Sequence, residues 1–204
     1  MNKLSLYILL LLCSVFTADA ITAEQVLANA ANGFSKASGI SASYTLKFQN
    51  GGSSNGSINV QGKKFRIETA QLMICYDGNN QWEYLAKSKQ CTLTAPSYQE
   101  TAQINPFAIL NTYKSSYKAA MAKSSIKGTY AVRLTPVSST SPISRATLYI
   151  KSSDWLPVRL DVLDKEGNLS TILIKEINLN AKFNDGTFTF DKKNYPGVEL
   201  IDLR

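Results

Sequence analysis

Apolar residues recur at helical spacing near the start of the chain, before the pattern changes to alternation. The recurring apolar positions are Val26, Leu27, Ala30, Ala31 and Phe34. This spacing is typical of an amphipathic helix, and Thr22 with Gln25 has the form of a capping box in front of it. Gly39 follows as a stop signal. The pattern therefore predicts one helix over residues 23–36.

Apolar and polar residues alternate through most of the remaining chain, in short runs separated by turn residues. Residues 41–94 contain about six such runs, and alternation resumes from residue 130 to residue 190. About eleven antiparallel strands at hairpin spacing predict a mainly β fold with some helix (α+β), arranged as an unclosed half-barrel. The apolar side chains assigned to its inner face are Tyr44, Leu46, Phe48, Ile58, Val60, Phe65, Ile67, Trp82 and Tyr84.

Residues 96–127 interrupt the alternation. Asn105-Pro106 is typical of a helix start with proline at the first position, and a weaker helical segment is expected at residues 116–123. The residues assigned to this helical lid are Pro106, Phe107, Ile109 and Leu110. Together with the N-terminal helix, the lid must cover the apolar face of the sheet. Two outcomes stay open: complete filling makes an ordinary core, and incomplete filling leaves an apolar cavity.

Residues 1–20 have the layout of a secretory signal peptide. Lys3 supplies the positive end, residues 4–16 form the apolar core, and Ala18 and Ala20 fit the rule for cleavage after small residues. The apolar core is shorter than a membrane span. We therefore expect residues 1–20 to be removed and residues 21–204 to form one domain of an exported protein.

Histidine is absent from the chain. Its absence excludes Ser-His-Asp and Cys-His hydrolases and histidine-ligated zinc sites. Among the carboxylates no catalytic pair is visible, and Asp77 is explained as a turn residue before Gly78. We expect no catalytic residue, metal or other cofactor, so composition favours a binding protein over an enzyme. The net charge of +7 favours acidic partners or anionic lipid headgroups, and the scattered lysines do not indicate nucleic-acid binding.

Two cysteines remain after removal of the signal peptide, which contains Cys13. An oxidising compartment favours pairing of Cys75 with Cys91. A third predicted strand lies between theirs, which in a flat sheet would separate them by about 9–10 Å, beyond the reach of a disulfide. A disulfide and two small apolar core residues therefore both stay open.

The order of elements and six short motifs resemble the LolA-like periplasmic carriers of outer-membrane lipoproteins. The motifs occur in the same order as in that family, at residues 41–48, 76–84, 105–110, 134–136, 188–190 and 196–198. The first resembles that family's first strand, the second its Asp-Gly hairpin before Trp-x-Tyr, and the third its Pro-Phe helix start. The resemblance covers nearly the whole chain after the signal peptide.

This resemblance implies a helical lid over a hydrophobic cavity that takes the acyl chains of lipoproteins or a related lipid. The protein would receive its cargo from an inner-membrane release complex, cross the periplasm as a monomer and deliver to an outer-membrane acceptor. The inner-face residues named above would line the cavity, and no covalent chemistry would be involved. The same fold would also suit an envelope sensor that binds lipid or glycolipid without carrying it.

The chain departs from the family at one position of interest. The best-known members carry Arg-Pro just before the Phe of the third strand, and that arginine is associated with holding the lid. Here Gln61-Gly62 stands at the matching positions, and Arg66 is expected to point outward because it alternates with Phe65 and Ile67. The resemblance therefore does not assign the contact that holds this lid.

Overall fold

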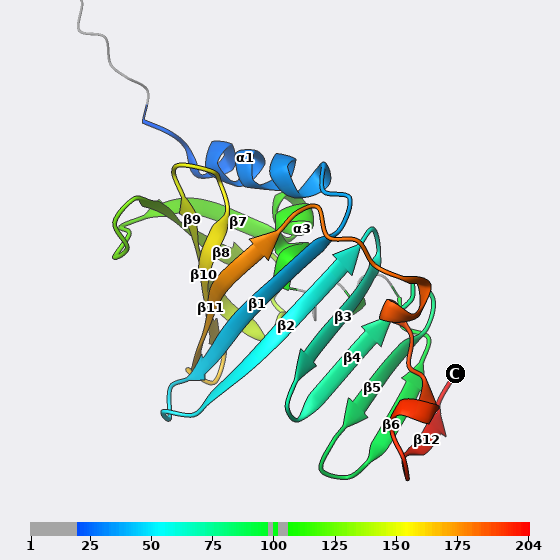
Figure 1. Ribbon diagram of the computed structural model, residues 1–204. Helices are drawn as coiled ribbons and strands as arrows, with labels where there is room; N and C mark the ends of the chain where they lie inside the picture. Colours follow the sequence, from blue (N-terminus) through cyan, green and yellow to red (C-terminus); the bar gives the residue numbers. More distant parts are fainter. Residues whose placement is uncertain (1–19, 98–99, 102–105) are drawn as a thin grey trace, which may run out of the picture.

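One curved sheet of twelve strands organises the molecule, in the order β12-β6-β5-β4-β3-β2-β1-β11-β10-β9-β8-β7 (Figure 1). The computed structural model describes residues 20–97, 100–101 and 106–204. The strands are β1 (Ile40–Phe48), β2 (Ser53–Gln61), β3 (Lys64–Thr69), β4 (Leu72–Tyr76), β5 (Gln81–Leu85), β6 (Gln90–Thr94), β7 (Tyr117–Ala122), β8 (Thr129–Pro136), β9 (Ile143–Lys151), β10 (Pro157–Asp164), β11 (Leu169–Asn178) and β12 (Glu199–Asp202). Of the predicted signal peptide, only Ala20 lies within the described residues, and Asn105 lies outside them.

Two meanders, β1–β6 and β7–β11, make up most of this sheet. They meet where β1 pairs antiparallel with β11, with a shift of register between Ser43 and Tyr44 that increases the local twist. The end strands β12 and β7 do not pair with each other, so the predicted unclosed sheet is confirmed. The sheet has one strand more than the sequence predicts, because residues 199–202, expected as a tail, form β12, which runs parallel to β6.

Helix α1 (Ala23–Ser35) begins at the predicted cap. The backbone N–H of Gln25 donates to Thr22 Oγ1 at 3.2 Å, and the backbone N–H of Thr22 donates to Gln25 Oε1 at 2.8 Å. This reciprocal pair satisfies two of the donors that a helix N-terminus leaves open. The helix packs against the lid helix and strands β7 and β8, so its apolar stripe covers one half of the sheet.

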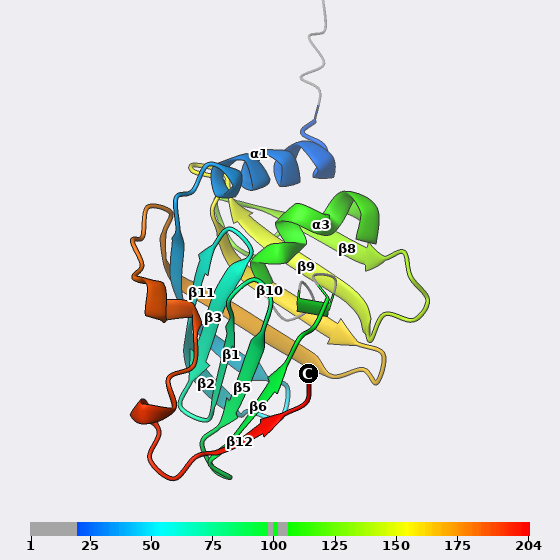
Figure 2. The same cartoon turned by 90° about the vertical axis from the view of Figure 1, so that its right-hand side faces the viewer.

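The lid is shorter than expected. It consists of the 3-10 turn η1 (Pro106–Ala108) and helix α3 (Ile109–Ser116), which Figure 2 shows on the same side of the sheet as α1. The helix expected at residues 116–123 is wrong, because the chain there forms β7 and pairs with β8. The alanines, lysine and methionine of this segment favour helix, but intrinsic propensity decides less than tertiary pairing, and pairing with β8 makes the segment a strand.

The hydrophobic core lies between these helices and the face of the sheet that they cover, called here the helix-covered face. It includes Val26, Leu27, Ala30 and Phe34 from α1, Phe107, Leu110 and Tyr113 from the lid, and Ile58, Phe65, Val132, Leu134, Leu148, Ile150 and Leu160 from the sheet. The opposite face of β3–β6 carries a second cover, residues 181–198, called here the C-terminal strap. Figure 2 shows the strap, in orange to red, on the other side of the sheet from α3. The strap therefore covers the face of β3–β6 that points away from the helices (Figure 2).

Candidate functional site

A small apolar void lies beneath α3, against the centre of the helix-covered face. Its volume is about 20 Å³, room for about one water molecule but without polar partners to hold it. The void is lined by Ala42, Tyr44, Ile58, Phe107, Ile109, Leu110, Leu148, Pro157, Leu160, Ile172 and Ile174. These residues come from both meanders and from the lid, so the void spans the junction of β1 with β11.

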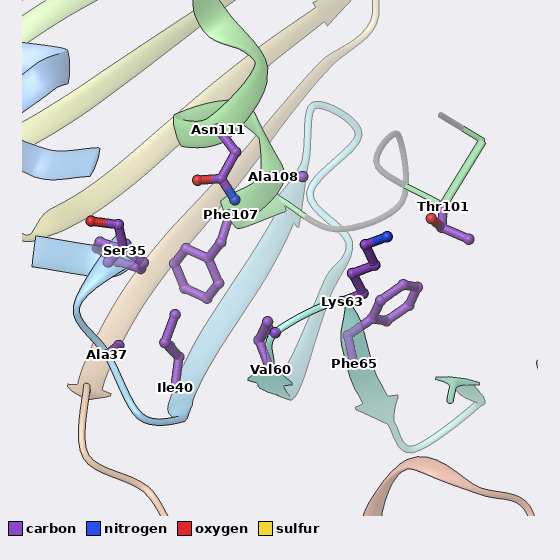
Figure 3. Close-up of a pocket in the computed structure, with 12 residues that line it drawn as sticks. Ser35, Ala37, Ile40, Val60, Lys63, Phe65, Thr101, Phe107, Ala108 and Asn111 are labelled. Atoms are coloured by element: carbon purple, nitrogen blue, oxygen red, sulfur yellow. The ribbon is translucent and has the colours of Figure 1, made fainter. Parts of the chain in front are cut away.

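A larger cavity of about 230 Å³ opens at the end of α1 (Figure 3). Its buried floor is mainly apolar and is formed by Phe34, Ile40, Val60, Phe65, Thr101, Phe107 and Ala108. Its exposed rim is polar and includes Ser35, Gly62, Lys63 and Asn111. This arrangement, with apolar walls inside and polar groups at the mouth, is typical of a site for an amphipathic molecule.

Phe107 separates the two spaces, because its ring lines both of them. In Figure 3 the ring points from the lid toward Ile40, into the larger cavity. It also packs against Phe34 of α1, with ring centroids 5.1 Å apart, and is only 7% exposed. The lid is therefore closed down on the sheet in this structure, and one aromatic side chain occupies the space between the two voids.

The predicted cavity residues are brought together in part. Tyr44, Ile58, Val60 and Phe65 line one of the two spaces. Leu46, Phe48 and Ile67 share the helix-covered face by register but line neither space, and Phe48 is 44% exposed. From the predicted lid, Phe107, Ile109 and Leu110 line the void, whereas the side chain of Pro106 is not described.

The prediction for Trp82 and Tyr84 is wrong, because both lie on the opposite face of the sheet. Phe65 pairs with Tyr76 across β3 and β4, and Tyr76 pairs with Gln81 across β4 and β5. Cross-strand partners share a face and successive residues alternate, so Gln81 and Glu83 take the helix-covered face. The two aromatic residues point toward the C-terminal strap instead.

Sequence reasoning missed the part of the site that comes from β9–β11. These residues are Leu148, Pro157, Leu160, Ile172 and Ile174. Their alternation is visible in the sequence, but alternation alone does not tell which residues of the second meander face the first. Pairing of β1 with β11 brings the two sets together across about 130 positions of sequence.

Gly56 gives the wall of the void its shape. A Cβ atom at this position would lie 2.5 Å from both Cζ and the hydroxyl oxygen of Tyr44, and 2.8 Å from the carbonyl oxygen of Glu68. The tyrosine ring therefore lies flat over the glycine of the neighbouring strand, its direct partner in the register. Burial raises the pKa of the Tyr44 hydroxyl, which keeps it neutral beside the apolar void.

Arg66 fastens the C-terminal strap to the opposite face. Its guanidinium donates to the backbone carbonyl of Thr187 at 3.5 Å and to the hydroxyl of Tyr195 at 3.3 Å, and pairs with Glu68 at 3.1 Å. The ring of Tyr195 packs on Tyr84, with centroids 4.6 Å apart. The expectation that Arg66 points outward is thus confirmed, and the residue holds the strap rather than the lid.

The two cysteines are free thiols beneath this strap, so the disulfide that the sequence left open is not formed. Cys75 lies on β4 and Cys91 on β6, with β5 between them. That separation is the geometric obstacle expected from strand spacing. Cys75 donates to the sulfur of Met73, and both thiols are completely buried.

The carboxylate of Asp77, considered above as a catalytic candidate, is held by hydrogen bonds within a turn. Asp77 Oδ1 accepts from the backbone N–H groups of Asn79 at 2.9 Å and Asn80 at 2.8 Å, which forms the turn between β4 and β5. Although burial alone would raise the pKa of Asp77, these hydrogen bonds hold the pKa below its usual value. Among the described residues no cluster of acidic and cysteine side chains is placed to hold a metal ion.

A known family matches most of the sequence. The family described as "Outer membrane lipoprotein carrier protein LolA" matches residues 13–168. The chain belongs to the LolA family. No curated protein matches it in sequence. Within the described part of this LolA-family chain, no helix is long and apolar enough to span a membrane.

Several solved structures resemble this chain at low sequence identity. An uncharacterized conserved protein from Thermus thermophilus is 13% identical, with a TM-score of 0.57 over 88% of this chain and 98% of that one. A LolA superfamily protein from Nitrosomonas europaea is 13% identical, with a TM-score of 0.44 over 84% and 99%. A chain of the MucA/MucB complex of Pseudomonas aeruginosa is 14% identical in sequence, with a TM-score of 0.42 over 84% of this chain and 62% of that one. The first of these likenesses supports the fold.

Proposed function

We propose that this protein is a periplasmic carrier that holds acyl chains of lipoproteins, or of a related lipid, between its sheet and its lid. It would receive the cargo at the inner membrane and hand it to an acceptor at the outer membrane, without covalent chemistry. The observation that carries the proposal is the apolar void under α3, which lies between two packed layers and touches both meanders. Membership in the LolA family supports the same function.

The closed lid has to move for cargo to enter, because about 20 Å³ holds no acyl chain. Taking the Phe107 ring out of its packing costs about 3–5 kcal/mol, by analogy with Phe-to-Ala substitutions in cores. Each methylene group removed from water contributes about 0.8 kcal/mol, so roughly six methylenes offset that cost. A long acyl chain is therefore able to replace Phe107 against the sheet.

Tryptophan fluorescence tests where an acyl chain binds. The chain has two tryptophans, so a Trp155→Phe variant retains only Trp82, on the opposite face. A Trp82→Phe/Trp155→Phe/Ile109→Trp variant places the only tryptophan in the lid, where half-buried Ile109 lines the void. A dibrominated fatty acid should quench the lid tryptophan strongly and Trp82 weakly. Equal quenching of both, or none, would contradict the proposed cavity.

A transfer assay tests the carrier role itself. The protein purified from periplasm is mixed with inner-membrane vesicles that contain a triacylated lipoprotein, and then with outer-membrane vesicles. We expect a soluble lipoprotein complex and net movement of the lipoprotein to the acceptor vesicles. If lipid binds but no lipoprotein leaves the donor vesicles, the alternative of a lipid-binding envelope sensor gains support.

A further inference from the structure

The 230 Å³ cavity at the end of α1 differs in character from the void beneath the lid. The void is lined by apolar side chains, whereas the cavity changes from a buried apolar floor to an exposed polar rim. Its floor reaches Phe107, the residue that it shares with the void. A molecule whose chain enters past Phe107 would leave its other end at this rim.

The charge at the rim of the larger cavity is positive. Lys63 is the charged residue among those that line the cavity, and none of the described lining residues is acidic. It extends from the turn between β2 and β3, on the far side of the cavity from the end of α1 (Figure 3). The last turn of α1 carries partial negative charge from its free carbonyl groups. An anionic group is therefore favoured on the Lys63 side of the rim and disfavoured on the helix side.

The volume of the larger cavity limits the size of the ligand that it can hold. A cavity of about 230 Å³ lies below the ~300–1,000 Å³ typical of pockets for drug-sized ligands. Together with the void it suits one chain, not three, unless the lid moves far from the sheet.

We propose that this cavity binds the anionic head of a single-chain amphiphile, a carboxylate or a phosphate, while its chain occupies the space now held by Phe107. The ammonium of Lys63 donates to the head, and the exposed amide of Asn111 on α3 lies at the same rim. The proposal rests on the proposed function in one respect, that an acyl chain enters beneath the lid. For the case of a related lipid, it adds the ligand class: one chain with one negative charge.

Competition binding with a matched set of ligands tests this. A fluorescent dansyl fatty acid is displaced by dodecanoate, dodecyl phosphate, dodecanol or dodecyltrimethylammonium, all below their micelle concentrations. We expect an anionic ligand to bind about tenfold more tightly than dodecanol, because a hydrogen bond to a charged group contributes more than a neutral one. The cation should bind most weakly. Dodecanoate and dodecyl phosphate separate a free fatty acid from a phosphorylated lipid as the source of the charge.

Two lysine variants supply the control. Lys63→Gln should weaken dodecanoate or dodecyl phosphate about tenfold and leave dodecanol unchanged. Lys64→Gln removes the same charge one residue away, from an exposed residue whose side chain takes the opposite face, and should change neither. Thermal unfolding of both variants, compared with that of the parent protein, separates a change in ligand affinity from a loss of stability.

The outcomes distinguish this inference from the proposed function. If dodecanol competes as well as dodecanoate, or if Lys63→Gln weakens both equally, the anionic head site is wrong while acyl-chain binding stands. If no member of the set competes and the lid tryptophan is not quenched, acyl-chain binding itself is wrong. An effect of Lys64→Gln equal to that of Lys63→Gln would assign the preference to net charge, which also overturns the site.

Discussion

The rings of Phe34 and Phe107 pack with their centroids 5.1 Å apart and their planes tilted by 38°. This contact joins the last turn of α1 to the first turn of the lid. Both rings line the larger cavity, and Phe107 also lines the void. Arg66 is engaged with the C-terminal strap on the opposite face, whereas this aromatic contact lies between the lid and α1.

Phe107→Ala should loosen the lid and join the two spaces. We expect the free energy of unfolding to fall by about 3–5 kcal/mol because a buried ring is removed. A saturating fatty acid should restore more stability to this variant than to the parent, since the chain fills the vacated space. Urea unfolding with and without ligand measures both effects. Phe107→Leu, which keeps most of the volume, should lose less, and an equal loss would contradict the role of the ring as a filler.

Gly56→Ala should strain the wall of the void. The added Cβ would meet the Tyr44 ring and a backbone carbonyl, so we expect a loss of about 1–3 kcal/mol. In a Tyr44→Ala background the same substitution should cost less, which a double-mutant cycle measures. Gly33→Ala is the matched control, because nothing lies within 4 Å of its Cβ position. It should stabilise helix α1 by about 0.5–1 kcal/mol, and destabilisation there would mean that the helix is not packed as described.

Arg66→Gln should expose the buried thiols to reagents. The substitution removes charge-assisted bonds to Thr187 and Tyr195, and we expect labelling of Cys75 by a thiol reagent to become roughly tenfold faster. Arg159→Gln is the control, because that arginine pairs with Asp161 at 2.7 Å in the other meander. Equal acceleration by both variants would indicate global unfolding rather than release of the strap.

High pH should destabilise the protein through the same thiols. Burial raises the pKa of Cys75 to about 11 and that of Cys91 to about 11, from a usual value of 9.0. A pKa raised by folding contributes stability that is present below about pH 9 and is lost as the pH rises toward 11. We expect a loss of about 1–3 kcal/mol per thiol between pH 8 and pH 11. A Cys75→Ala/Cys91→Ala variant should show a flatter pH dependence in urea unfolding, and an unchanged slope would assign the loss to tyrosines and lysines.

Much of the fold was predictable because its signals are local. The cap of α1, the alternation of the strands and the turn at Asp77 each depend on residues a few positions apart. The start of the lid at Pro106 is likewise a local signal. These elements appear where the sequence places them, with small differences at their ends.

The wrong predictions depend on contacts between residues that are far apart in the sequence. Trp82 and Tyr84 share a face with each other, as alternation requires, but alternation does not say which face meets the helices. Because the C-terminal strap covers the other face of the same strands, large aromatic residues are buried on both sides. Residues 116–123 are predicted as helix because alanine and lysine favour helix, whereas pairing with β8, which is not visible in the local sequence, makes them a strand.

The junction of β1 with β11 has a consequence for folding kinetics. Each meander forms from contacts between neighbours in sequence, whereas this junction closes a loop of more than one hundred residues, which is the slow kind of contact to form. The void takes its walls from both sides of that junction. A chain whose two halves have not yet joined therefore lacks the void, and the site proposed for cargo forms only when β1 pairs with β11.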